Sequence, residues 1–74
     1  MSLPENSIER EIAENVMKLE SLRSQLRSKR QEEAAATDDA VRARLQDEIK
    51  KLDIKEIALA AYTKELQSKR RASL

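Results

Sequence analysis

The chain contains no glycine, and its only proline is Pro4. Glycine and proline are the residues that most often interrupt or end regular backbone structure. From Glu5 to Leu74 nothing of this kind interrupts the chain, and most residues are Ala, Leu, Gln, Glu, Lys or Arg, which favour helices. We therefore expect an all-α fold with helix through almost the whole chain.

Apolar residues in the first half of the chain recur every three or four positions. This spacing places them on one face of an α-helix, within a sector of roughly 120° at about 100° per residue. The first stripe consists of Ile8, Ile12, Val16, Leu19, Leu22 and Leu26, and a second stripe consists of Val41, Leu45, Ile49, Leu52, Leu59, Tyr62 and Leu66. The sequence therefore predicts two amphipathic helices.

The segment between the two stripes contains signals for a turn. Thr37 or Asp38 is suited to cap the N-terminus of the second helix, and Asp39 complements the positive end of its dipole. We predict a single domain over residues 1–74, with a helix over about 5–35, a turn at about 36–38, a second helix over about 39–70 and a frayed tail at 71–74.

A single long helix in a coiled coil is the alternative fold. Neither glycine nor proline forbids it, and the three consecutive alanines at 34–36 favour helix. However, heptads extended from Leu19 and Leu22 reach Asp47 and Lys50 and omit the second apolar stripe. Because the two stripes are out of phase, the sequence favours a turn and a two-helix antiparallel hairpin.

In a hairpin the two stripes pack against each other and form an apolar seam. The predicted seam residues are Ile12, Leu19, Leu22, Leu26, Leu45, Ile49, Leu52, Leu59 and Leu66. Two helices with one seam leave the flanks of both stripes exposed, so burial against another chain would add stability. We therefore expect a homo-oligomer, for example two hairpins that dimerise into a four-helix bundle.

A second group of apolar residues lies outside the seam. Ile54, Ile57 and Ala61 are roughly 120–180° around the second helix from Leu45, and Met17 lies opposite the first stripe. A helix that is apolar on two sides is expected to be contacted on both. The predicted partner-binding residues are Met17, Ile54, Ile57, Ala58 and Ala61. The alternative is that they are scattered surface residues, which are common in soluble proteins.

The chain lacks the side chains on which most catalytic sites depend. It has no histidine or cysteine, so its serines have no imidazole base to activate them. It also lacks a glycine-rich phosphate-binding loop and the loop ligands typical of oxygen-rich metal sites. We expect a protein that is not an enzyme, with no catalytic residues, no cofactor and no metal.

Charge is balanced over the chain but clustered locally. Lys and Arg total 15 and Asp and Glu total 14, which argues against a dedicated nucleic-acid-binding protein. One basic cluster comprises Arg23, Arg27, Lys29 and Arg30, and the other comprises Lys69, Arg70 and Arg71. Both would suit the C-terminal ends of helices, where the dipole favours cations. The functional alternative is that these clusters bind phosphate-bearing or acidic surfaces.

The last five residues, Arg70-Arg71-Ala72-Ser73-Leu74, resemble the Arg-Arg-x-Ser-apolar consensus of cyclic-AMP-dependent protein kinase. The resemblance implies that Ser73 is a phosphorylation site in the predicted frayed tail. An ordinary chain end is the alternative interpretation of these residues.

The features point to a helical protein–protein interaction or oligomerisation module. Its partner would be a second copy of the chain or another helical protein, with no membrane or nucleic acid involved. No apolar run approaches the roughly 18–20 residues that cross a bilayer, so we expect a cytoplasmic protein. The remaining alternatives are an adaptor that binds acidic surfaces and a structural segment of a longer coiled coil.

Overall fold

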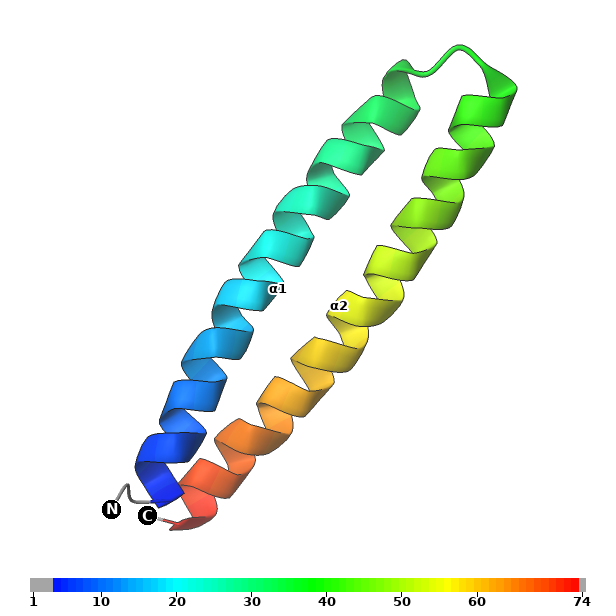
Figure 1. Ribbon diagram of the computed structural model, residues 1–74. Helices are drawn as coiled ribbons and strands as arrows, with labels where there is room; N and C mark the ends of the chain where they lie inside the picture. Colours follow the sequence, from blue (N-terminus) through cyan, green and yellow to red (C-terminus); the bar gives the residue numbers. More distant parts are fainter. Residues whose placement is uncertain (1–3, 74) are drawn as a thin grey trace.

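The computed structural model describes residues 4–73. It consists of two long helices, α1 (Pro4–Ala35) and α2 (Asp39–Ser73), which run antiparallel and pack against each other (Figure 1). The predicted two-helix hairpin is thus confirmed, and the single long helix is wrong. The Cα atoms span 55 × 15 × 15 Å, with the turn at one end and the start of α1 and the end of α2 at the other.

The end of α2 differs from the sequence-based prediction. Residues 71–73, which we expected to fray, continue the helix as far as Ser73. Nothing in Arg71–Ser73 breaks a helix, and Arg70 and Arg71 in the last turn complement the negative end of the dipole. Leu74 lies outside the described residues.

Asp38 caps the start of α2. Its Oδ1 accepts hydrogen bonds from the backbone N–H groups of Ala40 at 2.8 Å and Val41 at 3.4 Å. These N–H groups have no partner inside the helix, so the side chain satisfies donors that the turn would leave open. Asp38 is therefore the residue that fixes where α2 begins.

The end of α1 is stabilised from the opposite helix. The Arg42 guanidinium donates a 2.7 Å hydrogen bond to the carbonyl oxygen of Ala36, which follows the last residue of α1. The last turn of α1 itself contains no basic residue. We expected Arg27, Lys29 and Arg30 to suit the C-terminal end of this helix, but all three precede its last turn, because the helix continues to Ala35 as predicted. Dipole complementarity therefore does not explain the first basic cluster.

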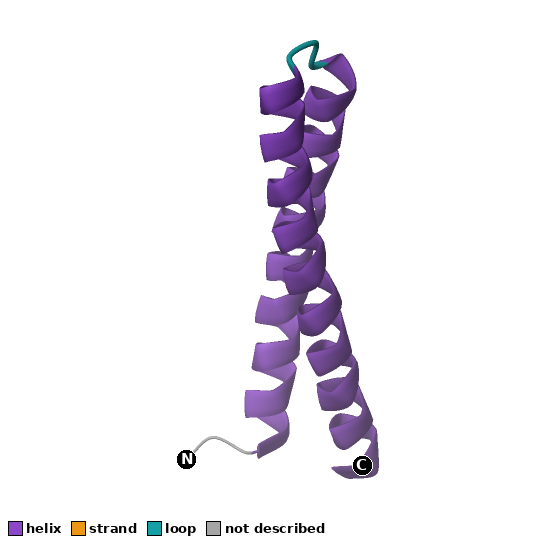
Figure 2. Ribbon diagram, turned by 90° about the vertical axis from the view of Figure 1, so that its right-hand side faces the viewer, coloured by secondary structure: helices purple, strands orange, loops and turns teal. Residues whose placement is uncertain are grey.

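The seam between the helices is narrow and regular. Of the predicted seam residues, Ile12, Leu19, Leu26, Leu45 and Leu66 are buried, and Leu22, Ile49, Leu52 and Leu59 are half-buried. Viewed from the side, the two helices cross at a shallow angle (Figure 2). Buried and half-buried positions alternate at spacings of four and three along each helix, the repeat typical of coiled coils.

This repeat places two polar residues in the seam where apolar ones were expected. Asn15 and Thr63 are each only 4% exposed. Their neighbours Val16 and Tyr62, which we assigned to the apolar stripes, are 39% and 43% exposed. The predicted stripes include only apolar residues, so neither contains Asn15 or Thr63. Steps that alternate between four and three residues place Asn15 in the seam between Ile12 and Leu19. They place Thr63 in the seam of α2 in the same way.

The same repeat explains why the chain turns back. Heptads continued from the α1 seam reach Asp47, which lies roughly 160° around α2 from both Leu45 and Ile49. On one continuous helix the two seams would therefore face nearly opposite directions. Only the turn brings both seams to the same interface.

Candidate interaction surface

The outer face of α2 exposes two large apolar side chains. Ile54 is 60% exposed and Ile57 is 65% exposed. Ile54 lies two residues from both Leu52 and Glu56 of the seam, which places it roughly 160° from the interface with α1. These side chains therefore contribute little to the hairpin and remain available at its surface.

Small residues surround the two isoleucines. Ala58 and Ala61 are both exposed on α2, and neither projects beyond its Cβ. Beyond them lies a shallow hollow of about 490 Å³, lined by Ala61, Lys64, Glu65, Ser68 and Lys69. Small side chains beside large ones let another helix approach closely, with its own side chains filling the gaps.

Met17 does not belong to this surface, although we grouped it with these residues. It is 70% exposed and lies two residues from both Asn15 and Leu19, on the side of α1 that faces away from α2. The outward sides of α1 and α2 are opposite edges of the hairpin. The five predicted partner-binding residues therefore divide into a cluster of four on α2 and Met17 alone on α1.

Ion pairs join the two helices beside the seam. Lys29 Nζ lies 2.8 Å from Glu48 Oε2, Arg23 Nε lies 3.2 Å from Glu56 Oε1, and Arg30 contacts Asp53 at 3.3 Å. All these side chains are partly or largely exposed, so each pair contributes little to stability. Their main effect is on register, because each pair forms only when the helices are correctly aligned along their length.

Two of the contacts between the helices shift pKa values. The hydrogen bond from Lys29 lowers the pKa of the Glu48 carboxyl, and the same bond with the Glu48 carboxylate raises the pKa of Lys29. The Tyr62 hydroxyl donates a hydrogen bond to Glu11 Oε1, and this bond raises the pKa of Tyr62. All three shifts favour the protonation states present near neutral pH.

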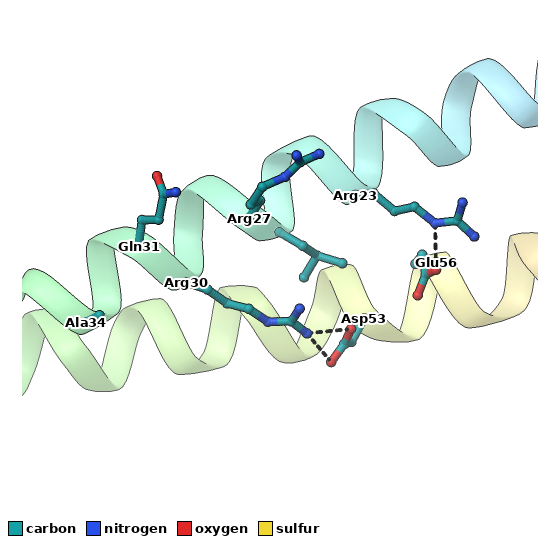
Figure 3. Close-up of a pocket in the computed structure, with 8 residues that line it drawn as sticks. Arg23, Arg27, Arg30, Gln31, Ala34, Asp53 and Glu56 are labelled. Atoms are coloured by element: carbon teal, nitrogen blue, oxygen red, sulfur yellow. Dashed lines mark hydrogen bonds and ion pairs between the residues drawn. The ribbon is translucent and has the colours of Figure 1, made fainter.

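A groove beside the seam collects much of the first basic cluster (Figure 3). It has a volume of about 500 Å³ and is lined by Arg23, Leu26, Arg27, Arg30, Gln31, Ala34, Asp53 and Glu56. Arg23 and Arg30 reach across to carboxylates of α2, whereas Arg27 points away from them. Within residues 4–73, Arg27 forms no ion pair. The second basic cluster lies at the far end of the hairpin.

Among residues 4–73, no three carboxylates lie close enough together to hold a metal ion. Neither α1 nor α2 is apolar enough over its length to span a membrane. The side chain of Ser73, the predicted phosphorylation site, lies outside the described residues, as does Leu74.

Comparison of the chain with protein-family models, with curated proteins and with solved structures found no match.

Proposed function

We propose that this protein is a non-enzymatic helical interaction module, and that the outer face of α2 docks another helix. The observation that carries the proposal is the exposure of Ile54 and Ile57 at 60% and 65%, on the side of α2 that faces away from the seam. Exposed aliphatic pairs of this kind are typical of helix-docking surfaces, because burying them against a partner removes apolar area from water.

The neighbouring residues support the same interpretation. Ala58 and Ala61 leave room beside the isoleucines for the side chains of a partner helix. Charged residues flank this apolar centre along α2, as a polar rim flanks the core of most interfaces. A two-helix domain also has a small core of its own, so it gains more from association than a larger domain would.

Sedimentation equilibrium of the wild type, Ile57→Glu and Met17→Glu tests the proposal. A glutamate at 57 would place a charge in the docked surface, so we expect self-association at least tenfold weaker than in the wild type. Met17→Glu is the matched control, because Met17 is equally exposed but lies on the opposite edge. Circular dichroism should show an intact helical fold for both variants. Identical association of the wild type and Ile57→Glu would contradict the proposal.

A second candidate function is the binding of phosphate-bearing or acidic surfaces through the Arg groove. The supporting observation is Arg27, a guanidinium beside two other arginines that has no acidic partner among the described residues. Asp53 and Glu56 offset two of the three positive charges, which weakens this candidate.

The second candidate function predicts binding of inorganic phosphate at Arg27. Titration followed by NMR should shift the amide signals of residues near Arg27, and added salt should suppress the shifts steeply. Arg27→Gln should abolish the shifts, whereas Arg10→Gln, on an exposed part of α1 away from the groove, should leave them unchanged. Equal shifts in both variants would exclude the groove as the binding site.

A further inference from the structure

The outer face of α2 carries a second regular repeat. Its members are exposed and alternate at spacings of three and four along the helix. They are Ala40, Ala43, Asp47, Lys50, Ile54, Ile57, Ala61, Lys64 and Ser68, and we call them the outer strip. The same spacing defines the seam, and it allows one helix to pack along another over several turns. On the outward side of α1, Met17 is the most exposed large apolar residue among those whose side chains are described, at 70%.

We propose that the outer strip binds a second copy of this chain, with the two α2 helices antiparallel and related by a two-fold axis. The axis lies level with the midpoint between Ile54 and Ile57, so each Ile54 faces the partner's Ile57. This proposal rests on the proposed function, since it names the partner of the same surface. A two-fold contact of this kind uses one patch twice and forms a closed dimer.

Charge complementarity points to the second copy. Residues at equal distances on either side of the axis face each other in an antiparallel pair. Asp47 lies seven positions before Ile54, and Lys64 lies seven positions after Ile57. The register that pairs the isoleucines therefore also pairs each Asp47 with Lys64 of the other copy. Opposite charges meet at both ends of the apolar centre.

The residues between these charges fit the same register. Lys50 falls opposite Ala61 of the other copy, where the small side chain leaves room for the aliphatic part of the lysine. On one flank of the strip, Lys51 approaches Glu65 of the other copy. Lys51 already lies 3.0 Å from Asp47 of its own helix, so the dimer would join these charges into a small network.

A parallel arrangement of the same two helices is unfavourable. It would bring each residue level with its own copy, so Asp47 would face Asp47 and Lys64 would face Lys64. Like charges in direct opposition cost free energy. On the other flank of the antiparallel pair, the two Asp53 residues lie close to the axis. Arg30 holds each Asp53 carboxylate at 3.3–3.4 Å, which offsets its charge.

Charge reversal tests the proposed pairing of Asp47 with Lys64. Asp47→Lys and Lys64→Asp should each weaken self-association about tenfold or more, because each places like charges at two symmetric contacts. The double variant Asp47→Lys/Lys64→Asp should restore the wild-type affinity in sedimentation equilibrium. All substituted positions are exposed, so circular dichroism should show an unchanged hairpin. Failure of the double variant to recover association would overturn the proposal.

Disulfide formation gives a second readout of orientation. The chain has no cysteine, so single-cysteine variants can cross-link only between copies. A mixture of Ile54→Cys and Ile57→Cys should oxidise preferentially to the mixed disulfide, whereas a parallel dimer would give the two homodisulfides. If Ile57→Glu dissociates the protein while neither charge reversal nor disulfide formation gives the result expected of an antiparallel pair, the antiparallel dimer is wrong and the docking surface stands. If Ile57→Glu has no effect, both proposals fail.

Discussion

At the residue scale, Asn15 is the least expected feature of the seam. It is 4% exposed, and its Nδ2 donates no hydrogen bond to any residue among 4–73. An unpaired buried amide opposes folding, so an apolar side chain would be more stable at this position. The other buried polar residue differs, because the Thr63 hydroxyl donates a 2.7 Å hydrogen bond to the Leu59 carbonyl one turn earlier.

Asn15→Leu should therefore stabilise the hairpin. We expect a gain of about 1–3 kcal/mol in the free energy of unfolding, since the substitution removes an unpaired donor and adds apolar burial. Urea denaturation followed by circular dichroism would measure it. Thr63→Val is the matched control and should change stability much less, because the hydroxyl already has a partner. A loss of stability in Asn15→Leu would show that the amide has a stabilising partner.

Arg42 and Asp38 show how single side chains define the turn. Asp38 accepts hydrogen bonds from two backbone N–H groups at the start of α2, and Arg42 donates one to the Ala36 carbonyl that follows α1. No described residue has a positive φ angle, which is why the turn forms without glycine. Side-chain hydrogen bonds replace the left-handed glycine that commonly ends a helix.

At the scale of the helices, each element has two faces with different roles. The seam face of α2 holds the hairpin together, while its outer face carries Ile54 and Ile57. The sides between these faces carry ion pairs to α1, including Lys29 with Glu48 at 2.8 Å. These pairs do little for stability individually but oppose other registers of the two helices.

The Lys29–Glu48 pair predicts how stability depends on pH. Because folding lowers the pKa of Glu48 below its usual 4.5, the pair stabilises the fold above that pH. The contribution is lost as the pH falls through the lower folded-state pKa. Glu48→Gln should therefore melt at a lower temperature than the wild type at pH 7, and the difference should shrink as the pH falls below 4.5.

Thermal melts followed by circular dichroism between pH 7 and pH 3 would measure this difference. Glu20→Gln removes an exposed carboxylate of α1 and serves as the matched control. A Glu48→Gln variant whose melting temperature remains below that of the wild type throughout this range would show that the ion pair is not the cause.

At the scale of the whole molecule, the architecture depends on the difference in heptad phase between the seam of α1 and the seam of α2. The seam of α1, continued in heptads, would reach the outer side of α2, at Asp47 and Ile54. The seam of α2 is displaced from this continuation by two residues. A straight helix would therefore bury one seam and expose the other, whereas the hairpin buries both.

Deletion of Thr37 and Asp38 should convert the hairpin into a long two-chain coiled coil. Removing two residues brings both seams onto one face of a continuous helix, and it also removes the cap that starts α2. Small-angle scattering should show a particle about 100 Å long, as expected for about 70 residues at 1.5 Å each.

Replacement of the same two residues by alanine is the control for this deletion. It removes the cap but keeps the phase difference, so the hairpin should survive with its 55 Å length and lower stability. A deletion variant that keeps the 55 Å length of the hairpin would show that the phase difference between the two seams does not cause the chain to turn back.

Helix content, the position of the turn and the hairpin itself could be predicted because they depend on local chemistry. The absence of glycine, the spacing of the apolar residues and the capping residues at Thr37–Asp39 are local signals. Each depends only on residues that are close together in the chain. The burial of Asn15 could not be read from residue type, since an asparagine in an apolar seam contradicts its intrinsic preference. A search for positions that alternate at spacings of four and three residues, regardless of residue type, would have placed Asn15 in the seam.

The candidate surface was predictable only in part. Helical periodicity placed Ile54, Ile57 and Ala61 away from the seam, because angles around one helix follow from the sequence. The same reasoning grouped Met17 with them, although it lies on the opposite edge of the molecule. Positions around one helix say nothing about how the outward sides of two helices are related.

The sequence by itself determined that this chain forms two helices with a turn near Thr37, since helix propensity, capping and apolar periodicity are properties of neighbouring residues. The tertiary structure decided which side chains share the seam, that Arg42 caps the opposite helix, and that Met17 and Ile57 lie on separate edges. These features depend on the alignment of two helices in space, and that alignment results from packing and charge pairing between residues far apart in the chain.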